Sequence, residues 1–164
     1  VGDYVQVVCQ GDDIGMQSGL IISPELYRRF IKPCHRRIFE KIRSRTGAKI
    51  FMHSCGSIFE IIPDLIELGV EALNPIQRNA AKMNIFHLKQ EFGHDLCFWG
   101  GGIDVQRDLP TADLEEIERI IQETLKQVGR GGGYIFALTH NIQPDVEPNK
   151  VDKAYQSALE YRTL

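Results

Sequence analysis

The chain has 164 residues, a formal net charge of −3 and four cysteines. This slightly acidic balance argues against a non-specific nucleic-acid binder, which needs a basic surface. A hydrophobic fraction of 43% with 25% charged residues is typical of a folded globular protein. No apolar run approaches the roughly 20 residues that cross a bilayer. The cysteines are too sparse for a secreted disulfide scaffold, so we expect a cytoplasmic protein with reduced thiols.

Short apolar segments alternate with amphipathic stretches along the chain. The short segments are rich in β-branched and aromatic residues, and they predict strands at 4–9, 49–53, 70–73, 96–99 and 134–138. The amphipathic stretches predict helices at 23–46, 57–68, 82–92, 111–128 and 151–161. The predicted strands lack polar alternation, which favours a parallel α/β fold with both faces of the sheet covered.

The first predicted helix is long and contains Pro33, which we expect to kink or divide it. Its apolar residues fall at the spacing of an amphipathic helix: Leu26, Phe30, Ile31, Cys34, Ile38 and Ile42. Three histidines lie on helices or in the turn after one, and we expect them at the surface: His35, His87 and His94.

Two architectures fit the alternation of strands and helices, an open doubly wound sheet or part of a (β/α)8 barrel. No GxGxxG follows the first strand, so a dinucleotide fold has no positive support. Five predicted strands are too few to close an eight-stranded barrel. The chain starts at Val1 and runs directly into a predicted strand, so we hold open that it is a piece of a longer protein.

Polar residues follow the predicted strands at their carboxyl ends, where parallel α/β folds collect their active sites. The residues that we expect to meet at this rim are Asp12, Asp13, His53, Cys55, Asn74, Asp104, His140 and Asn141. The acidic pair Asp12 and Asp13 suits a general acid or a substrate-binding group, and equally a pair that caps a turn.

His53 and Cys55 stand two residues apart at a strand end, so their side chains point to the same side. This geometry suits two ligands of one zinc ion, and His140 could supply a third. Three protein ligands leave one coordination position open, which is the arrangement of catalytic zinc. The other interpretation is that Cys55 is simply packed at the end of its strand.

Several motifs in the same order resemble the uroporphyrinogen decarboxylase superfamily. They are QGDDIGMQ at 10–17, ISPELY at 22–27, FMHSCGS at 51–57, FWGGGID at 98–104 and THNIQPDV at 139–146. The resemblance implies an α/β fold of the (β/α)8 TIM-barrel type, of which residues 1–164 would be the C-terminal portion with about five βα units. A partial barrel exposes sheet edges, so we also expect a homo-oligomer.

The superfamily contains uroporphyrinogen decarboxylases, which act on a tetrapyrrole without a cofactor, and methyltransferases, which move a methyl group from a corrinoid to a thiol. The methyltransferases carry a His-x-Cys zinc pair and a later Cys, so the resemblance implies zinc at His53 and Cys55. Here His140 stands at the later position. Zinc favours the thiolate form of a thiol whose free pKa is about 8.5, which supports methyl transfer.

The resemblance and the rim together assign roles to the candidate residues. We expect Asp13 and His140 to be catalytic, and Asp12, Asn74, Asp104 and Asn141 to bind substrate or support the ligands. The expected partners are a small thiol or tetrapyrrole substrate and a corrinoid-carrying protein. Two alternatives stay open: tetrapyrrole decarboxylation without metal, and a catalytically incomplete fragment of a barrel.

Overall fold

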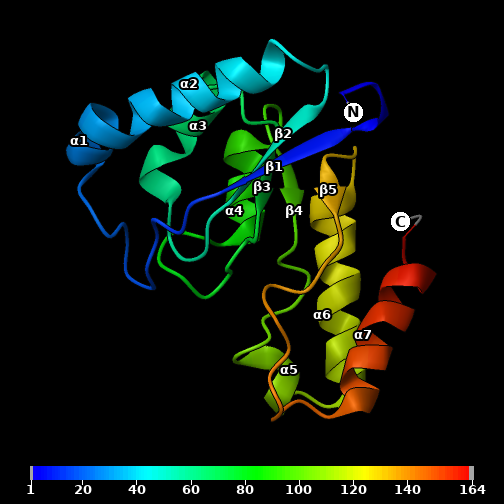
Figure 1. Ribbon diagram of the computed structural model, residues 1–164. Helices are drawn as coiled ribbons and strands as arrows, with labels where there is room; N and C mark the ends of the chain where they lie inside the picture. The colour runs from blue at the N-terminus through cyan, green and yellow to red at the C-terminus, as the bar shows by residue number, and fades with distance from the viewer. Residues whose placement is uncertain (1, 163–164) are drawn as a thin grey trace.

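The structure is a computed structural model, and it describes residues 2–162. Its centre is a single parallel sheet in the order β1-β2-β3-β4-β5 (Figure 1). The strands are Val7–Gly11, Lys49–His53, Ala72–Asn74, Cys97–Trp99 and Tyr134–Ile135. A doubly wound sheet reverses its strand order at a switch point, whereas a barrel wall adds each strand beside the last. The unbroken order therefore confirms the prediction of a partial (β/α)8 barrel.

Helices follow the strands in chain order. They are α1 (Pro24–Leu26), α2 (Lys32–Arg43), α3 (Ile62–Glu67), α4 (Ile85–Phe92), α5 (Asp108–Thr111), α6 (Leu114–Thr124) and α7 (Pro148–Glu160). Short 3₁₀ turns cover Gly2–Tyr4 and Phe59–Ile61, and wider π-helical turns cover Tyr27–Ile31 and Leu125–Gly129. Within residues 2–162, none of these helices combines the length and the apolar character that crossing a bilayer requires.

The long helical segment begins at Ser23, whose hydroxyl accepts the Leu26 N–H at 3.2 Å. Pro33 lies in the first turn of α2, directly after the π-helical turn Tyr27–Ile31. Proline lacks the N–H that a regular helix would use here. The predicted disturbance at Pro33 therefore takes the form of a change in helical pitch.

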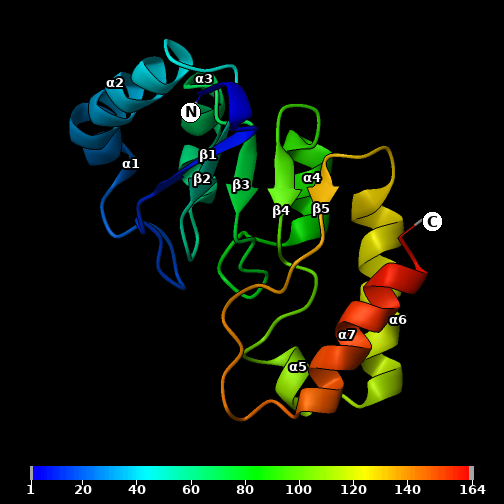
Figure 2. The same cartoon turned by 45° about the vertical axis from the view of Figure 1, so that its right-hand side comes forward.

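Two hydrophobic cores lie on the helix-covered side of the sheet. The first core packs α2, α3 and α4 against strand residues that are fully buried: Ile50, Met52, Leu73 and Phe98. The second core lies between α6 and α7, which run side by side at the C-terminal end of the chain (Figure 2). Its buried residues include Ile117 and Ile121 of α6 and Ala154 of α7.

The opposite face of the sheet is only partly covered by the described residues. Val7 and Ile135 are each 40% exposed, and Phe51 and Trp99 are partly buried. A hollow of about 400 Å³ on this face is lined by residues that include Val7, Trp99 and Ile135. The expectation that both faces are covered is therefore wrong for the described part of the chain. In a complete barrel, this face of the sheet would point toward the barrel axis.

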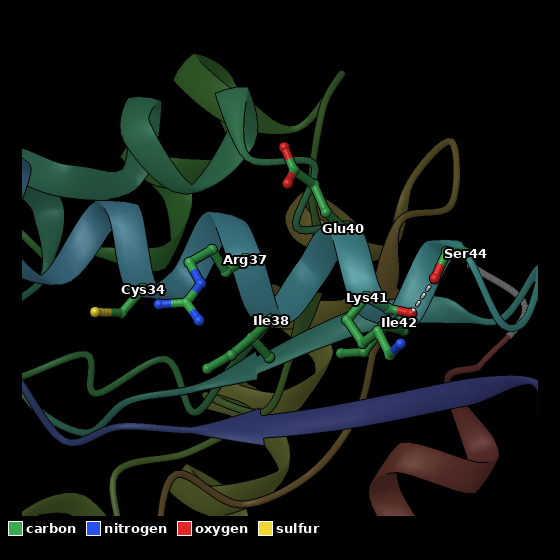
Figure 3. A pocket seen from close by; sticks show the side chains of 7 residues that line it. All are labelled: Cys34, Arg37, Ile38, Glu40, Lys41, Ile42 and Ser44. Atoms are coloured by element: carbon green, nitrogen blue, oxygen red, sulfur yellow. Dashed lines mark hydrogen bonds between the residues drawn. The ribbon is translucent and has the colours of Figure 1, made fainter.

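The helical segment 24–43 buries only part of the apolar set predicted from its spacing, because Ile31 and Ile42 pack against the first core whereas other members face outward. Tyr27, His35 and Phe39 are buried, whereas Phe30 is 56% and Leu26 44% exposed. The segment is apolar on two sides, and periodicity alone did not show which side meets the sheet. The outward side borders a groove of about 880 Å³ along α2 (Figure 3). Its lining comprises Cys34, Arg37, Ile38, Glu40, Lys41, Ile42 and Ser44.

Candidate metal centre

Asp13, His53 and Cys55 form a group of side chains that could hold a metal ion, at the carboxyl ends of β1 and β2. One ligand atom from each residue lies within 4.8 Å of the others. The His53 Nε2 atom lies 3.7 Å from Cys55 Sγ and 3.9 Å from an Asp13 carboxylate oxygen. The structure therefore brings together the predicted pair His53 and Cys55, and it adds Asp13, which the sequence suggested as a catalytic residue.

The orientation of the His53 ring is fixed by Asn74 at the end of β3. Asn74 Nδ2 donates to the Trp99 carbonyl oxygen at 2.9 Å, so the amide oxygen of Asn74 faces His53. His53 Nδ1 lies 2.7 Å from that oxygen and must donate its proton to it. The Nε2 atom consequently carries the lone pair, and it faces Cys55 and Asp13. Such a partner on the second ring nitrogen is typical of metal-binding histidines.

Cys55 lies in a loop that is held closely against the loop after β1. Its backbone N–H donates to the Asp13 carboxylate at 2.8 Å. A Cβ atom placed on Gly56 would lie 2.7 Å from the Gly15 carbonyl oxygen, so this contact requires glycine. Burial, and then the negative charge of Asp13, raise the pKa of the Cys55 thiol. The thiol would therefore need a cation beside it to become a thiolate.

His140 and Asn141 lie across a cavity of about 440 Å³ that extends from His53 and Asn74. Tyr155 of α7 also lines this cavity. The side chain of His140 is not among the clustered ligand atoms, which are those of Asp13, His53 and Cys55 in the described chain. The role of His140 as a third zinc ligand remains a prediction. Tyr155 was missed, because a single tyrosine on a helix carries no signal in the sequence.

Asp12 and Asp104 do not line this cavity, and their carboxylates form hydrogen bonds elsewhere. The carboxylate of Asp12 lies 2.9 Å from the Nε2 atom of His35, which is buried although the sequence placed it at the surface. Asp104 is 2% exposed, and its Oδ1 atom accepts the N–H groups of Gln106 and Arg107 just before α5. The structure thus gives Asp104 a capping role. Substrate binding by either aspartate remains a prediction.

The uroporphyrinogen decarboxylase (URO-D) family model matches residues 1–161 of this chain. The chain belongs to the URO-D family. This membership agrees with the partial barrel. A methylated-thiol:coenzyme M methyltransferase of Methanosarcina mazei is 24% identical over 110 residues. A uroporphyrinogen decarboxylase of Thermus thermophilus is 28% identical over 134 residues.

A solved structure of a methyltransferase from Methanosarcina mazei also has the URO-D fold of this chain. It matches with a TM-score of 0.70 at 20% sequence identity, over 96% of this chain and 43% of the methyltransferase. The M. mazei and T. thermophilus sequence matches cover 67% and 79% of this chain, but only 27% and 35% of those proteins. The chain therefore spans less than half the length of these relatives.

Proposed function

We propose that this URO-D chain carries the zinc-binding side of an active site that transfers a methyl group from a corrinoid to a thiol. The observation that carries the proposal is the convergence of Asp13, His53 and Cys55, with the His53 tautomer set by Asn74. An oxygen, a nitrogen and a sulfur atom form a donor set that zinc accepts readily. The M. mazei relative, which is named a methylated-thiol:coenzyme M methyltransferase, supports the same chemistry.

The separations of His53 Nε2 from the other two donor atoms suit zinc. Two ligands of tetrahedral zinc, with bonds of about 2.0 to 2.3 Å, lie about 3.5 Å apart. The 3.7 Å and 3.9 Å separations of His53 Nε2 from Cys55 Sγ and Asp13 are close to that value. Three protein ligands would leave the fourth position for a substrate thiol.

Bound zinc would lower the pKa of a substrate thiol, so that its sulfur becomes a nucleophile at neutral pH. The chain's own residues would prepare this chemistry. Asn74 fixes the ring of His53, and Asp13 holds the backbone of Cys55. The cavity beside His53 would receive the rest of the substrate, with His140 and Asn141 as its polar wall. The corrinoid would be carried by a partner protein.

The second candidate function is decarboxylation of a tetrapyrrole without metal. It is favoured by several relatives that are uroporphyrinogen decarboxylases, among them the protein of T. thermophilus. It leaves the grouping of a thiol, an imidazole and a carboxylate without a role. For this reason we rank it below methyl transfer.

The proposal is tested by the metal content of the purified chain. We expect about one zinc ion per chain, removable by a chelator and restored by added zinc. Less than about a tenth of a zinc ion per chain, with no uptake on addition, would overturn the zinc site. For the reaction, a protein long enough to contain the whole barrel is given methylcobalamin and a thiol, or uroporphyrinogen. Release of carbon dioxide without formation of a methyl thioether would favour the decarboxylase.

A further inference from the structure

His35 is a buried histidine with a hydrogen-bond partner on each ring nitrogen. It is 1% exposed, and its ring stacks on Phe39 with centroids 5.7 Å apart. The hydroxyl group of Tyr27 lies 3.1 Å from Nδ1, and the Asp12 carboxylate lies 2.9 Å from Nε2. If Nε2–H donates to the carboxylate, Nδ1 accepts the tyrosine proton, and every polar atom of this chain of contacts is satisfied.

Asp12 connects this histidine to the loop that carries the candidate metal ligand Asp13. The N–H of Asp12 donates to the carbonyl oxygen of His53 at 3.0 Å. The next two residues continue the pattern, since Asp13 accepts the Cys55 N–H at 2.8 Å and the Ile14 N–H donates to the Ser54 hydroxyl at 3.2 Å. Residues 12–14 are thus each hydrogen-bonded to one residue of the segment 53–55.

Among residues 12–14, only Asp12 also has a side-chain hydrogen bond to α2 in the described structure. We infer that His35 is a positioning residue, which acts through Asp12 to hold Asp13 against His53 and Cys55. A hydrogen bond to a carboxylate is stronger and more directional than one between neutral groups. The buried ring of His35 cannot move away, because it is packed between Tyr27 and Phe39. This inference rests on the proposed metal site and adds to it the residue that preorganises one ligand.

The competing interpretation is that His35 only stabilises α2 and its contact with the sheet. The two interpretations differ in what they predict for the metal site. A purely structural role lowers the free energy of unfolding and leaves the metal affinity of the folded chain unchanged. A positioning role lowers the metal affinity even in variants that are fully folded. Partners of ligands affect metal affinity by about 10–100-fold.

The test uses Co²⁺ as the probe, with the 164-residue chain and the visible absorption of its thiolate complex. Asp12→Ala removes the carboxylate from a half-exposed position, so it leaves no buried cavity. His35→Phe keeps a ring against Phe39 and removes both hydrogen bonds. We expect each variant to bind Co²⁺ about tenfold more weakly, and the double variant to be no weaker than the weaker single variant.

Two further variants serve as controls. Asp12→Asn keeps an oxygen that can accept from His35, and we expect its affinity to stay within about threefold of the parent. Asp64→Asn weakens the ion pairs of Asp64 with Arg28 and Lys32 and lowers stability without contacting this loop. We expect its Co²⁺ affinity to equal that of the parent. Equal loss of affinity in Asp64→Asn and Asp12→Ala would overturn the positioning role.

A second readout does not depend on metal. The Cys55 N–H donates to the Asp13 carboxylate, and we expect this hydrogen bond to slow its hydrogen exchange. We expect Asp12→Ala to speed its exchange at least about tenfold, and Asp64→Asn to leave it unchanged. If the parent binds no Co²⁺ but Asp12→Ala loses this protection, the metal proposal fails and the positioning role stands. If the parent binds Co²⁺ and Asp12→Ala changes neither affinity nor exchange, the positioning role fails alone.

Discussion

The two sides of the cavity next to His53 differ in how firmly their side chains are held. On one side, His53 and Asn74 are hydrogen-bonded to each other, and Asp13 holds the Cys55 backbone. On the other side, the side chains of His140 and Asn141 have no hydrogen bond within the described residues. A rigid side suits a ligand of fixed geometry such as a metal ion, whereas a loose side can adapt to a substrate.

Each side of the cavity rests on its own core. His53 and Cys55 stand at the end of β2, whose buried residues Ile50 and Met52 belong to the first core. The segment with His140 continues from Leu138, which belongs to the second core, and Thr139 is tied to the Ile103 carbonyl oxygen at 2.9 Å. Thr139 is the last buried residue of this segment, and the next two side chains, His140 and Asn141, are exposed. We therefore expect substitutions at the two sides to have different consequences for metal binding.

The largest expected effect is the loss of metal binding in Cys55→Ala. Removing one of three ligands should weaken Co²⁺ binding by more than about 100-fold, because thiolate is the ligand with the highest affinity in the set. The matched variant His140→Ala, on the loose side, should change the affinity by less than about threefold. Metal titration of the folded chain measures both.

A loss of more than about tenfold in His140→Ala would contradict this division. It would mean that His140 moves to the metal as a ligand, as the sequence suggested. The distinction between a rigid and a loose side would then have to be withdrawn for this residue.

Asn74→Ala should have a smaller effect, of about 10–100-fold on metal affinity. The variant removes the oxygen that holds His53 Nδ1–H, so the ring can rotate and the lone pair of Nε2 is no longer aimed at the metal. Asn74→Asp keeps an acceptor at this position and should bind metal more tightly than Asn74→Ala. If the two variants bind equally weakly, the oxygen of Asn74 does not orient the ligand.

The architecture was accessible from the sequence, because hydrophobic periodicity and turn residues act locally. All five strands and the main helices occur close to their expected positions. The ends were less accurate, and the predicted strand 134–138 contains only the short β5, Tyr134–Ile135. Its last residues leave the sheet to form the cavity wall. Pairing with a neighbouring strand decides where a strand ends, and a single segment does not contain that information.

The site was predicted in part. The spacing of His53 and Cys55 identified the pair, since alternate residues of a strand share a face. The strand ends also predicted that Asp13 lies at the same rim, but Asp13 as a third candidate ligand depends on the tertiary contact between two loops. His35 was misplaced because a histidine among charged residues resembles a surface position, and only Tyr27 and Asp12 satisfy its buried nitrogens. Asp104 was predicted to face the substrate, but its carboxylate accepts backbone N–H groups of the next turn. A position at a strand end does not show where a carboxylate points.

The smallest expected effect concerns stability and compares an ion pair of each core. Asp64 of α3 is almost buried beside Arg28 and Lys32. Burial would raise its pKa, but the hydrogen bonds from Arg28 and Lys32 outweigh burial and hold the pKa below the usual 3.8. Glu118 of α6, which pairs with Lys153 of α7, is more exposed. The pKa of Glu118 is also lowered, first by its hydrogen bond from Lys153.

A carboxylate with a lowered pKa in the folded state stabilises the protein above its ordinary pKa, and this contribution is lost as pH falls through the lowered value. Urea unfolding of the parent should therefore lose stability between about pH 5 and about pH 3. Asp64→Asn should reduce that loss by about 1 kcal/mol, because its ion pair is largely shielded from water. Glu118→Gln should alter it less, since water screens the partly exposed Glu118 carboxylate more than that of Asp64. A larger effect for Glu118→Gln would contradict this order. It would show that the α6–α7 contact depends more on its ion pair than α3 depends on the pairs of Asp64.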